Sequence, residues 1–94
     1  MIVVGKRALS EFARTHASAR EAIAAWTLEV ESASWQTTMD IKTRYASASF
    51  FGNNRVVFNL KGNQFRLDVQ VNYATQTVLV RRIGTHAEYD SWTF

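Results

Sequence analysis

The sequence predicts an α+β domain in which two N-terminal helices pack on a twisted antiparallel sheet of three to four strands. Apolar residues follow helical spacing in the first third of the 94-residue chain and alternate with polar residues in the second half. Helices followed by consecutive strands are typical of an antiparallel sheet that is covered on one face. The length allows one hydrophobic core, so residues 1–94 are interpreted as a single domain.

The helices are expected first along the chain. Residues 1–4 form a short strand candidate, and from Lys6 the apolar residues recur on one helical face until a break at residues 15–17. A second helix is expected to extend to about Val30. Ser18 and Glu21 have the spacing of a capping box, which predicts that Ser18 caps this helix. The sequence TTMD similarly favours a short helix over residues 39–45.

The strands are expected in the second half of the chain. A period of two predicts strands at residues 55–61, 64–73 and 77–84. The turn residues at 62–63 and 74–76 separate them. These three strands would form an antiparallel meander.

The middle strand is predicted to have one apolar and one polar face. Arg66 and Asp68 alternate with the apolar residues that face the helices, and Lys61 or Asn59 would lie at the end of the neighbouring strand. Two interpretations are open. The polar face is either a platform for an anion, or an ordinary solvated surface on which Arg66 and Asp68 merely lie near each other.

The charge distribution favours a polyanionic partner. The formal net charge is +3, and between residues 41 and 82 Asp68 is the only acidic residue among seven Lys and Arg residues. A basic half of a small domain is typical of nucleic-acid binding, and the alternative is a charged surface that keeps the protein in solution. The candidate RNA-binding residues are Arg55, Arg81, Arg82, Asn59 and Asn72.

Composition excludes several classes of site and location. The absence of cysteine excludes disulfides and a thiolate zinc site, and fits a reducing compartment. No apolar stretch approaches the roughly 20 residues of a membrane helix, and the N-terminal residues lack the features of a signal peptide. A cytoplasmic protein without membrane contact is therefore expected. The two histidines are distant in sequence without an accompanying carboxylate cluster, so neither a metal nor another cofactor is expected.

Several titratable residues follow the last predicted strand, in the sequence VLVRRIGTHAEYD. His86 and Tyr89 lie a few residues after Arg81 and Arg82. One histidine with several cations suits metal-free RNA cleavage, in which the 2′-hydroxyl attacks the neighbouring phosphate. Arginine can stabilise the negative charge that develops on the phosphate. The alternative is that His86 and Tyr89 only pack against the domain.

Residues 52–90, GNNRVVFNLKGNQFRLDVQVNYATQTVLVRRIGTHAEYD, resemble the HigB toxins of toxin–antitoxin systems, which belong to the RelE/ParE-like superfamily. The segment AREAIAAWTLEVESASW resembles the same family, so the resemblance spans nearly the whole chain. It implies two helices on a twisted antiparallel sheet and an endonuclease that cuts mRNA on the ribosome. It also implies a HigA-like helix-turn-helix antitoxin through which the toxin reaches operator DNA.

The resemblance also implies roles for individual residues. Arg66 in QFRL is similar to a phosphate-contacting arginine of RelE-like nucleases, and Lys61 to a basic residue at the end of the preceding strand. His86 occupies a place where those enzymes often carry a cation, and Tyr89 resembles their C-terminal tyrosine. The expected site therefore has His86 as general acid or base, Arg66 and Lys61 on the scissile phosphate, and Tyr89 orienting the substrate or stacking on a base.

Two other functions remain open at this point. A non-catalytic module could bind RNA or the ribosome through the basic sheet. A ParE-like toxin, which poisons DNA gyrase, is a second alternative from the same superfamily, although such toxins generally lack this set of cations and histidine.

Overall fold

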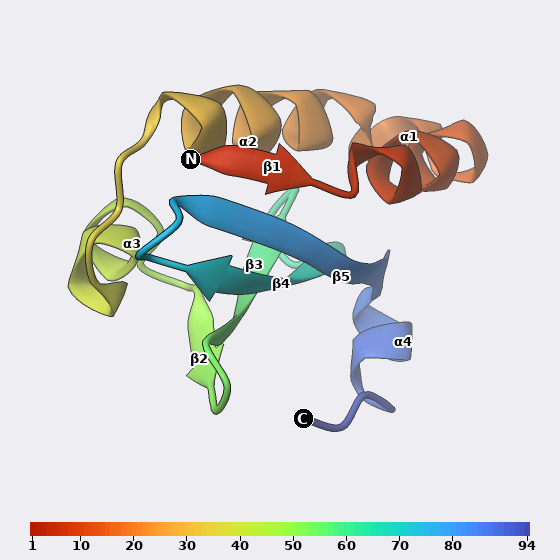
Figure 1. Cartoon of the computed structure of the whole chain (residues 1–94). Helices are drawn as coiled ribbons and strands as arrows, with labels where there is room; N and C mark the ends of the chain where they lie inside the picture. Colours follow the sequence, from red (N-terminus) through yellow and green to blue (C-terminus); the bar gives the residue numbers. More distant parts are fainter.

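A five-stranded sheet is covered on one face by two antiparallel helices, as Figure 1 shows for the computed structural model of residues 1–94. The strand order is β1-β5-β4-β3-β2. The strands are β1 (Ile2–Val4), β2 (Ser49–Phe51), β3 (Arg55–Leu60), β4 (Phe65–Asn72) and β5 (Thr77–Thr85). The helices are α1 (Lys6–Thr15), the 3₁₀-helix η1 (Ala17–Ala19), α2 (Arg20–Ser32), α3 (Thr38–Arg44) and α4 (His86–Tyr89).

The α+β class is confirmed, but the prediction of two N-terminal helices on three to four antiparallel strands is incomplete, because η1, α3 and α4 are also present and the sheet has five strands of mixed direction. β1 joins the sheet as an edge strand parallel to β5, with Val3 paired with Val78, so the sheet is mixed. β2 adds the fifth strand, antiparallel to β3. The short strand expected at residues 1–4 is thus confirmed as β1, whereas β2 was not predicted, and both strands have three residues. Alternation with a period of two is hardly visible over so short a segment, and pairing partners distant in sequence decide whether it forms a strand.

One of the two predicted helix caps is wrong. Ser18 lies inside η1, and α2 begins at Arg20 without a side-chain cap, because Ala19 already has helical backbone angles. The 3₁₀-helix therefore leads directly into α2. The short third helix is confirmed as α3, where Thr37 N–H donates to the Asp40 carboxylate over 3.2 Å.

The hydrophobic core lies between the helices and the sheet. Phe58 is at its centre, with the ring of Trp26 at 5.5 Å and that of Trp35 at 6.1 Å between centroids. The predicted alternation in β4 is confirmed, since Leu67 and Val69 are fully buried against this core. Burying each such side chain contributes about 1.5–3 kcal/mol. No helix in the structure has the length and apolar character needed to cross a bilayer.

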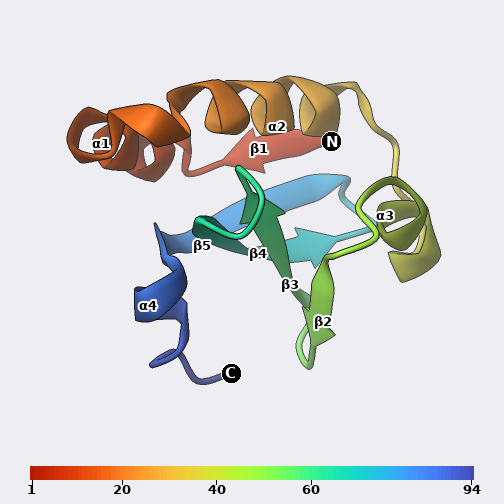
Figure 2. The same cartoon turned by 180° about the vertical axis from the view of Figure 1, so that it is seen from behind.

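The face of the sheet turned away from α1 and α2, called here the open face, carries the C-terminal residues. Figure 2 shows α4 and the C-terminus on the side of the sheet opposite to α1 and α2. The β3–β4–β5 register places Val57, Asp68 and Arg82 side by side on this face. The open face is therefore neither bare nor fully solvated.

Gly5 is expected to be essential for the connection between β1 and α1. Its φ of 94° lies in the left-handed region, and an added Cβ would lie 3.2 Å from Val80 Cβ on β5. We expect Gly5→Ala to lower the free energy of unfolding by about 1–2 kcal/mol, measured by urea denaturation. Gly52→Ala is the matched control, because an added Cβ there has no atom within 4 Å. Equal effects of the two substitutions would contradict this prediction.

Candidate active site

Arg66 and His86 meet at the end of the sheet where β4 begins and β5 ends. Arg66 is paired in register with Gly84, and α4 starts at His86, directly after β5. The Arg66 Nη2 atom lies 2.7 Å from His86 Nδ1. The Tyr89 ring stacks over the same guanidinium, with its centroid 5.2 Å from the Arg66 Cζ atom. Three of the four predicted catalytic residues are therefore in contact.

The short helix α4 is held in place by local hydrogen bonds. Thr85 and Glu88 form a capping box, in which Thr85 N–H donates to Glu88 Oε1 over 2.9 Å and Glu88 N–H donates to Thr85 Oγ1 over 3.2 Å. The hydrogen bond from the Thr85 backbone lowers the pKa of the Glu88 carboxyl below its usual 4.5. The His86 N–H also donates to the Gln64 carbonyl over 3.0 Å, which ties α4 to the β3–β4 turn. The position of His86 is thus fixed by the capping box of α4 and by the hydrogen bond to the β3–β4 turn.

The contact with Arg66 determines which nitrogen of His86 carries the proton. A guanidinium has only donors, so His86 Nδ1 must accept this hydrogen bond. The neutral imidazole then carries its proton on Nε2. His86 is exposed, and its Nε2 has no hydrogen-bond partner within the chain. The ring therefore presents an N–H donor to solvent or to a substrate.

Arg66 is a buried cation without an acidic partner. The residue is only 7% exposed, and its Nη1 atom donates to the Asn63 carbonyl over 2.9 Å. The five ion pairs of the structure do not include it. The acceptors of its guanidinium are His86 Nδ1 and the Asn63 carbonyl oxygen, and neither carries a negative charge. An anion that approaches His86 would therefore be attracted by an uncompensated positive charge.

Arg66, His86 and Tyr89 are called here the Arg66–His86 cluster. The other predicted site residues lie at different distances from it. Asn59 is the register partner of Arg66 on β3 and donates to the Ser47 carbonyl over 3.3 Å. Lys61 is in the β3–β4 turn with a φ of 51° and makes no hydrogen bond to Arg66 or His86. It lines a pocket whose other residues are Ala17, Ser18, Arg20, Glu21 and Ala22. Asn72 is at the opposite end of β4, where its side chain accepts from Thr75 N–H. Only Asn59 is therefore next to the cluster.

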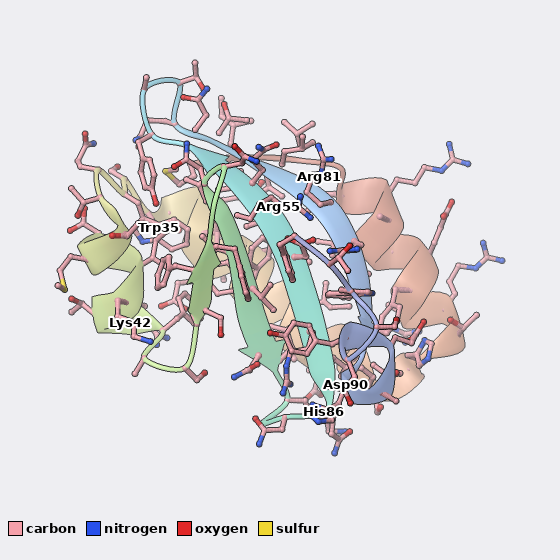
Figure 3. All side chains as sticks on the ribbon, turned by 90° about the horizontal axis from the view of Figure 1, so that it is seen from below. Trp35, Lys42, Arg55, Arg81, His86 and Asp90 are labelled. Atoms are coloured by element: carbon pink, nitrogen blue, oxygen red, sulfur yellow. The ribbon has the colours of Figure 1, made fainter.

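Arg55, Arg81 and Arg82 differ from one another in their surroundings. Arg55 Nε and Arg82 Nε donate to the Asp68 carboxylate over 3.0 and 2.8 Å. The hydrogen bond of Arg55 to Asp68 raises the pKa of the Arg55 guanidinium. Arg81 is exposed in the irregular register opposite Asp68 and Val69. Figure 3 shows Arg55 and Arg81 away from the end of the sheet that carries His86.

The interpretation of Asp68 as part of a solvated surface is wrong. Asp68 is 0% exposed, and its carboxylate is shared by Arg55 and Arg82. Its neighbour Val57 is also buried on the open face. Strand alternation identified the face to which Asp68 points, but burial on that face comes from the C-terminal residues that fold across it.

Sequence reasoning missed residues that surround the candidate site. The motif THAE at residues 85–88 has the capping-box spacing that predicts the start of α4, and this signal was available. Trp92 lies on the open face beside Tyr89, with 5.5 Å between ring centroids, and no periodic pattern predicted that contact. No three His, Asp or Glu side chains converge in a group able to hold a metal ion. The largest groove, of about 550 Å³, lies between α1 and α2 and contains none of the residues of the Arg66–His86 cluster.

The chain also matches a known protein family. Residues 19–92 match the family model HigB_toxin, described as the RelE-like toxic component of a toxin-antitoxin system. The protein is therefore a RelE-like toxin. Because the match covers well over half of the chain, the protein belongs to the HigB toxin family, and its partner is an antitoxin. Comparison with curated proteins gives no match.

Proposed function

We propose that the protein is an endoribonuclease that cuts mRNA on the ribosome and thereby inhibits translation. The contact between Arg66 and His86 carries this proposal, because it combines a buried, uncompensated cation with an exposed imidazole donor. RelE-like toxins generally act as endoribonucleases. The ribosome as the place of cleavage, and with it a cytoplasmic location, follows from the resemblance to the HigB family.

The proposed reaction is attack of the RNA 2′-hydroxyl on its own phosphate. A bond forms between the 2′ oxygen and phosphorus, and the bond from phosphorus to the 5′ oxygen breaks. Arg66 stabilises the additional negative charge on the phosphate oxygens. The chain supplies fixed positive charge by itself, so the proposed reaction is metal-independent and no step requires a cofactor.

The tautomer of His86 favours one of its two candidate roles. A base must have an unprotonated nitrogen directed at the substrate, but the free Nε2 of the neutral ring carries a proton. Donation from Nε2 to the departing 5′ oxygen is therefore favoured over abstraction of the 2′ proton, which passes to water. A neutral imidazole is too weak an acid to complete this step, so Arg66 turns from Nδ1 to the phosphate, the ring takes up a second proton from water, and the imidazolium delivers its Nε2 proton to the 5′ oxygen. Tyr89 would orient the substrate beside the same guanidinium.

The antitoxin is proposed to be a HigA-like helix-turn-helix protein. The resemblance to the HigB family supports this identity, since such antitoxins carry the DNA-binding domain of the pair. The toxin would then reach operator DNA only through its partner.

The proposed reaction predicts the chemical ends of the products. Cleavage fragments should carry a 2′,3′-cyclic phosphate, or the 3′-phosphate into which it opens, and a 5′-hydroxyl. Messages isolated from cells after brief toxin expression can be tested for ligation that depends on prior 5′ phosphorylation. A substrate with 2′-O-methyl at the cut position should resist cleavage, whereas methylation two nucleotides away serves as the control. Fragments with a 5′-phosphate and a free 3′-hydroxyl would rule the mechanism out.

A further inference from the structure

Aromatic rings and guanidinium groups form an uninterrupted row across the open face of the sheet. At the β2 side Phe51 stacks on Phe94, with ring centroids 4.0 Å apart and planes inclined by 3°. The Phe94 ring lies 5.0 Å from the Arg82 Cζ atom and 5.3 Å from that of Arg55. The C-terminal residues thus connect β2 with the centre of the sheet.

The row continues to the candidate active site. The Arg82 guanidinium lies over the Trp92 ring at 4.5 Å, and Trp92 meets Tyr89 edge to face at 5.5 Å. Tyr89 in turn stacks on Arg66, which contacts His86. The aromatic–arginine row, in order along the open face, is Phe51, Phe94, Arg82, Trp92, Tyr89 and Arg66.

The row is accessible and positively charged. Phe94 is 48% exposed, and Phe51, Arg82, Trp92 and Tyr89 are partly exposed. Asp68 is the only acidic residue in strands β2 to β5, and its carboxylate is fully buried. These strands therefore present cations to solvent, and the exposed carboxylates beside the row are those of Glu88 and Asp90 in the C-terminal segment.

Rings interleaved with cations suit one class of ligand. Single-stranded nucleic acid offers bases that stack on aromatic side chains and phosphates that attract arginine, whereas the bases of a duplex are already stacked. We infer that the aromatic–arginine row binds the single-stranded RNA that flanks the cleavage position. Bases stack on the solvent-exposed parts of the Trp92 and Phe94 rings, and the strand continues past Tyr89 to His86. This inference rests on the proposed RNA-cleaving function.

A purely structural role of the same residues predicts the opposite result. If the C-terminal residues only cover Asp68 and act as a lid, their removal would leave RNA affinity unchanged or increase it. If they form the stacking surface, their removal weakens binding. The sign of the change in affinity therefore separates the two roles.

The test measures binding of a fluorescent single-stranded RNA that is 2′-O-methylated throughout and cannot be cut by the proposed reaction. Loss of one stacked base corresponds to about 1–3 kcal/mol, so Trp92→Ala and Phe94→Ala should each weaken binding about 5- to 150-fold. Trp92→Phe keeps a ring and should retain most of the affinity. Leu28→Ala, on the exposed surface of α2, should bind as the wild type does. Unchanged or tighter binding of both alanine variants would overturn the inference.

Two further measurements make the result unambiguous. Phe94→Leu keeps apolar contact but removes the ring, so it should fold with a wild-type urea midpoint and still lose affinity. Cleavage of unmodified mRNA by the wild type is measured separately. Wild-type binding without cleavage would refute the proposed function but not the inferred RNA-binding role of the aromatic–arginine row. Cleavage together with undiminished binding by the ring variants would refute that RNA-binding role alone.

Discussion

Replacing His86 with glutamine is expected to abolish mRNA cleavage and growth inhibition while the protein remains folded. Glutamine cannot transfer a proton as imidazole does, and general acid or base catalysis contributes about 100- to 10,000-fold to a rate. His86 is exposed at the start of α4, and the capping box of Thr85 and Glu88 does not depend on its ring. Turnover should therefore fall while RNA affinity and the urea midpoint are retained.

His16 provides the matched control for this experiment. Its ring stacks on Phe12 with 4.0 Å between centroids, and Thr15 Oγ1 lies 3.0 Å from its Nδ1. His16→Gln should leave cleavage within a few fold of the wild type. Undiminished toxicity of His86→Gln without any cleavage of mRNA would instead favour a module that only binds RNA or the ribosome. A collapsed unfolding transition would show that His86 is structural.

Replacing Asp68 with alanine is expected to cause the largest loss of stability of any single change on the open face. Removing one partner of a buried ion pair typically costs about 3–5 kcal/mol, because the other charge stays in the protein without compensation. Here two arginines would lose their shared carboxylate. The Arg82 side chain is 33% exposed and can be partly hydrated, so the lower part of this range is expected. Urea denaturation at neutral pH measures the change.

Asp90→Ala is the control for Asp68→Ala, since Asp90 is an exposed aspartate after α4 that makes no ion pair. It should change the free energy of unfolding by less than about 0.5 kcal/mol. A loss below about 1 kcal/mol for Asp68→Ala would mean that Arg55 and Arg82 find sufficient solvent without it.

The amino-acid sequence alone determined the α+β class, the central strands and the family. Period-two alternation predicted β3, β4 and β5 to within a few residues, because each strand is long enough for its two faces to differ. The same alternation assigned Leu67 and Val69 to the core and Arg66 to the other face. The resemblance to HigB toxins, carried by the long segment 52–90, agrees with the matching family model. These properties depend on neighbouring residues along the chain.

Only the tertiary structure decided how distant segments meet. The three-residue β2 became a strand because β3 offered a free edge, and the strand expected at residues 1–4 pairs in parallel with β5. Asp68 became a buried ion-pair centre because two arginines from other strands reach it. Arg66 and His86 are 20 residues apart, and their contact depends on the β4–β5 register and on the direction in which α4 leaves the sheet. A local pattern specifies which face a side chain takes, but its partner and protonation depend on long-range packing, which no local pattern contains.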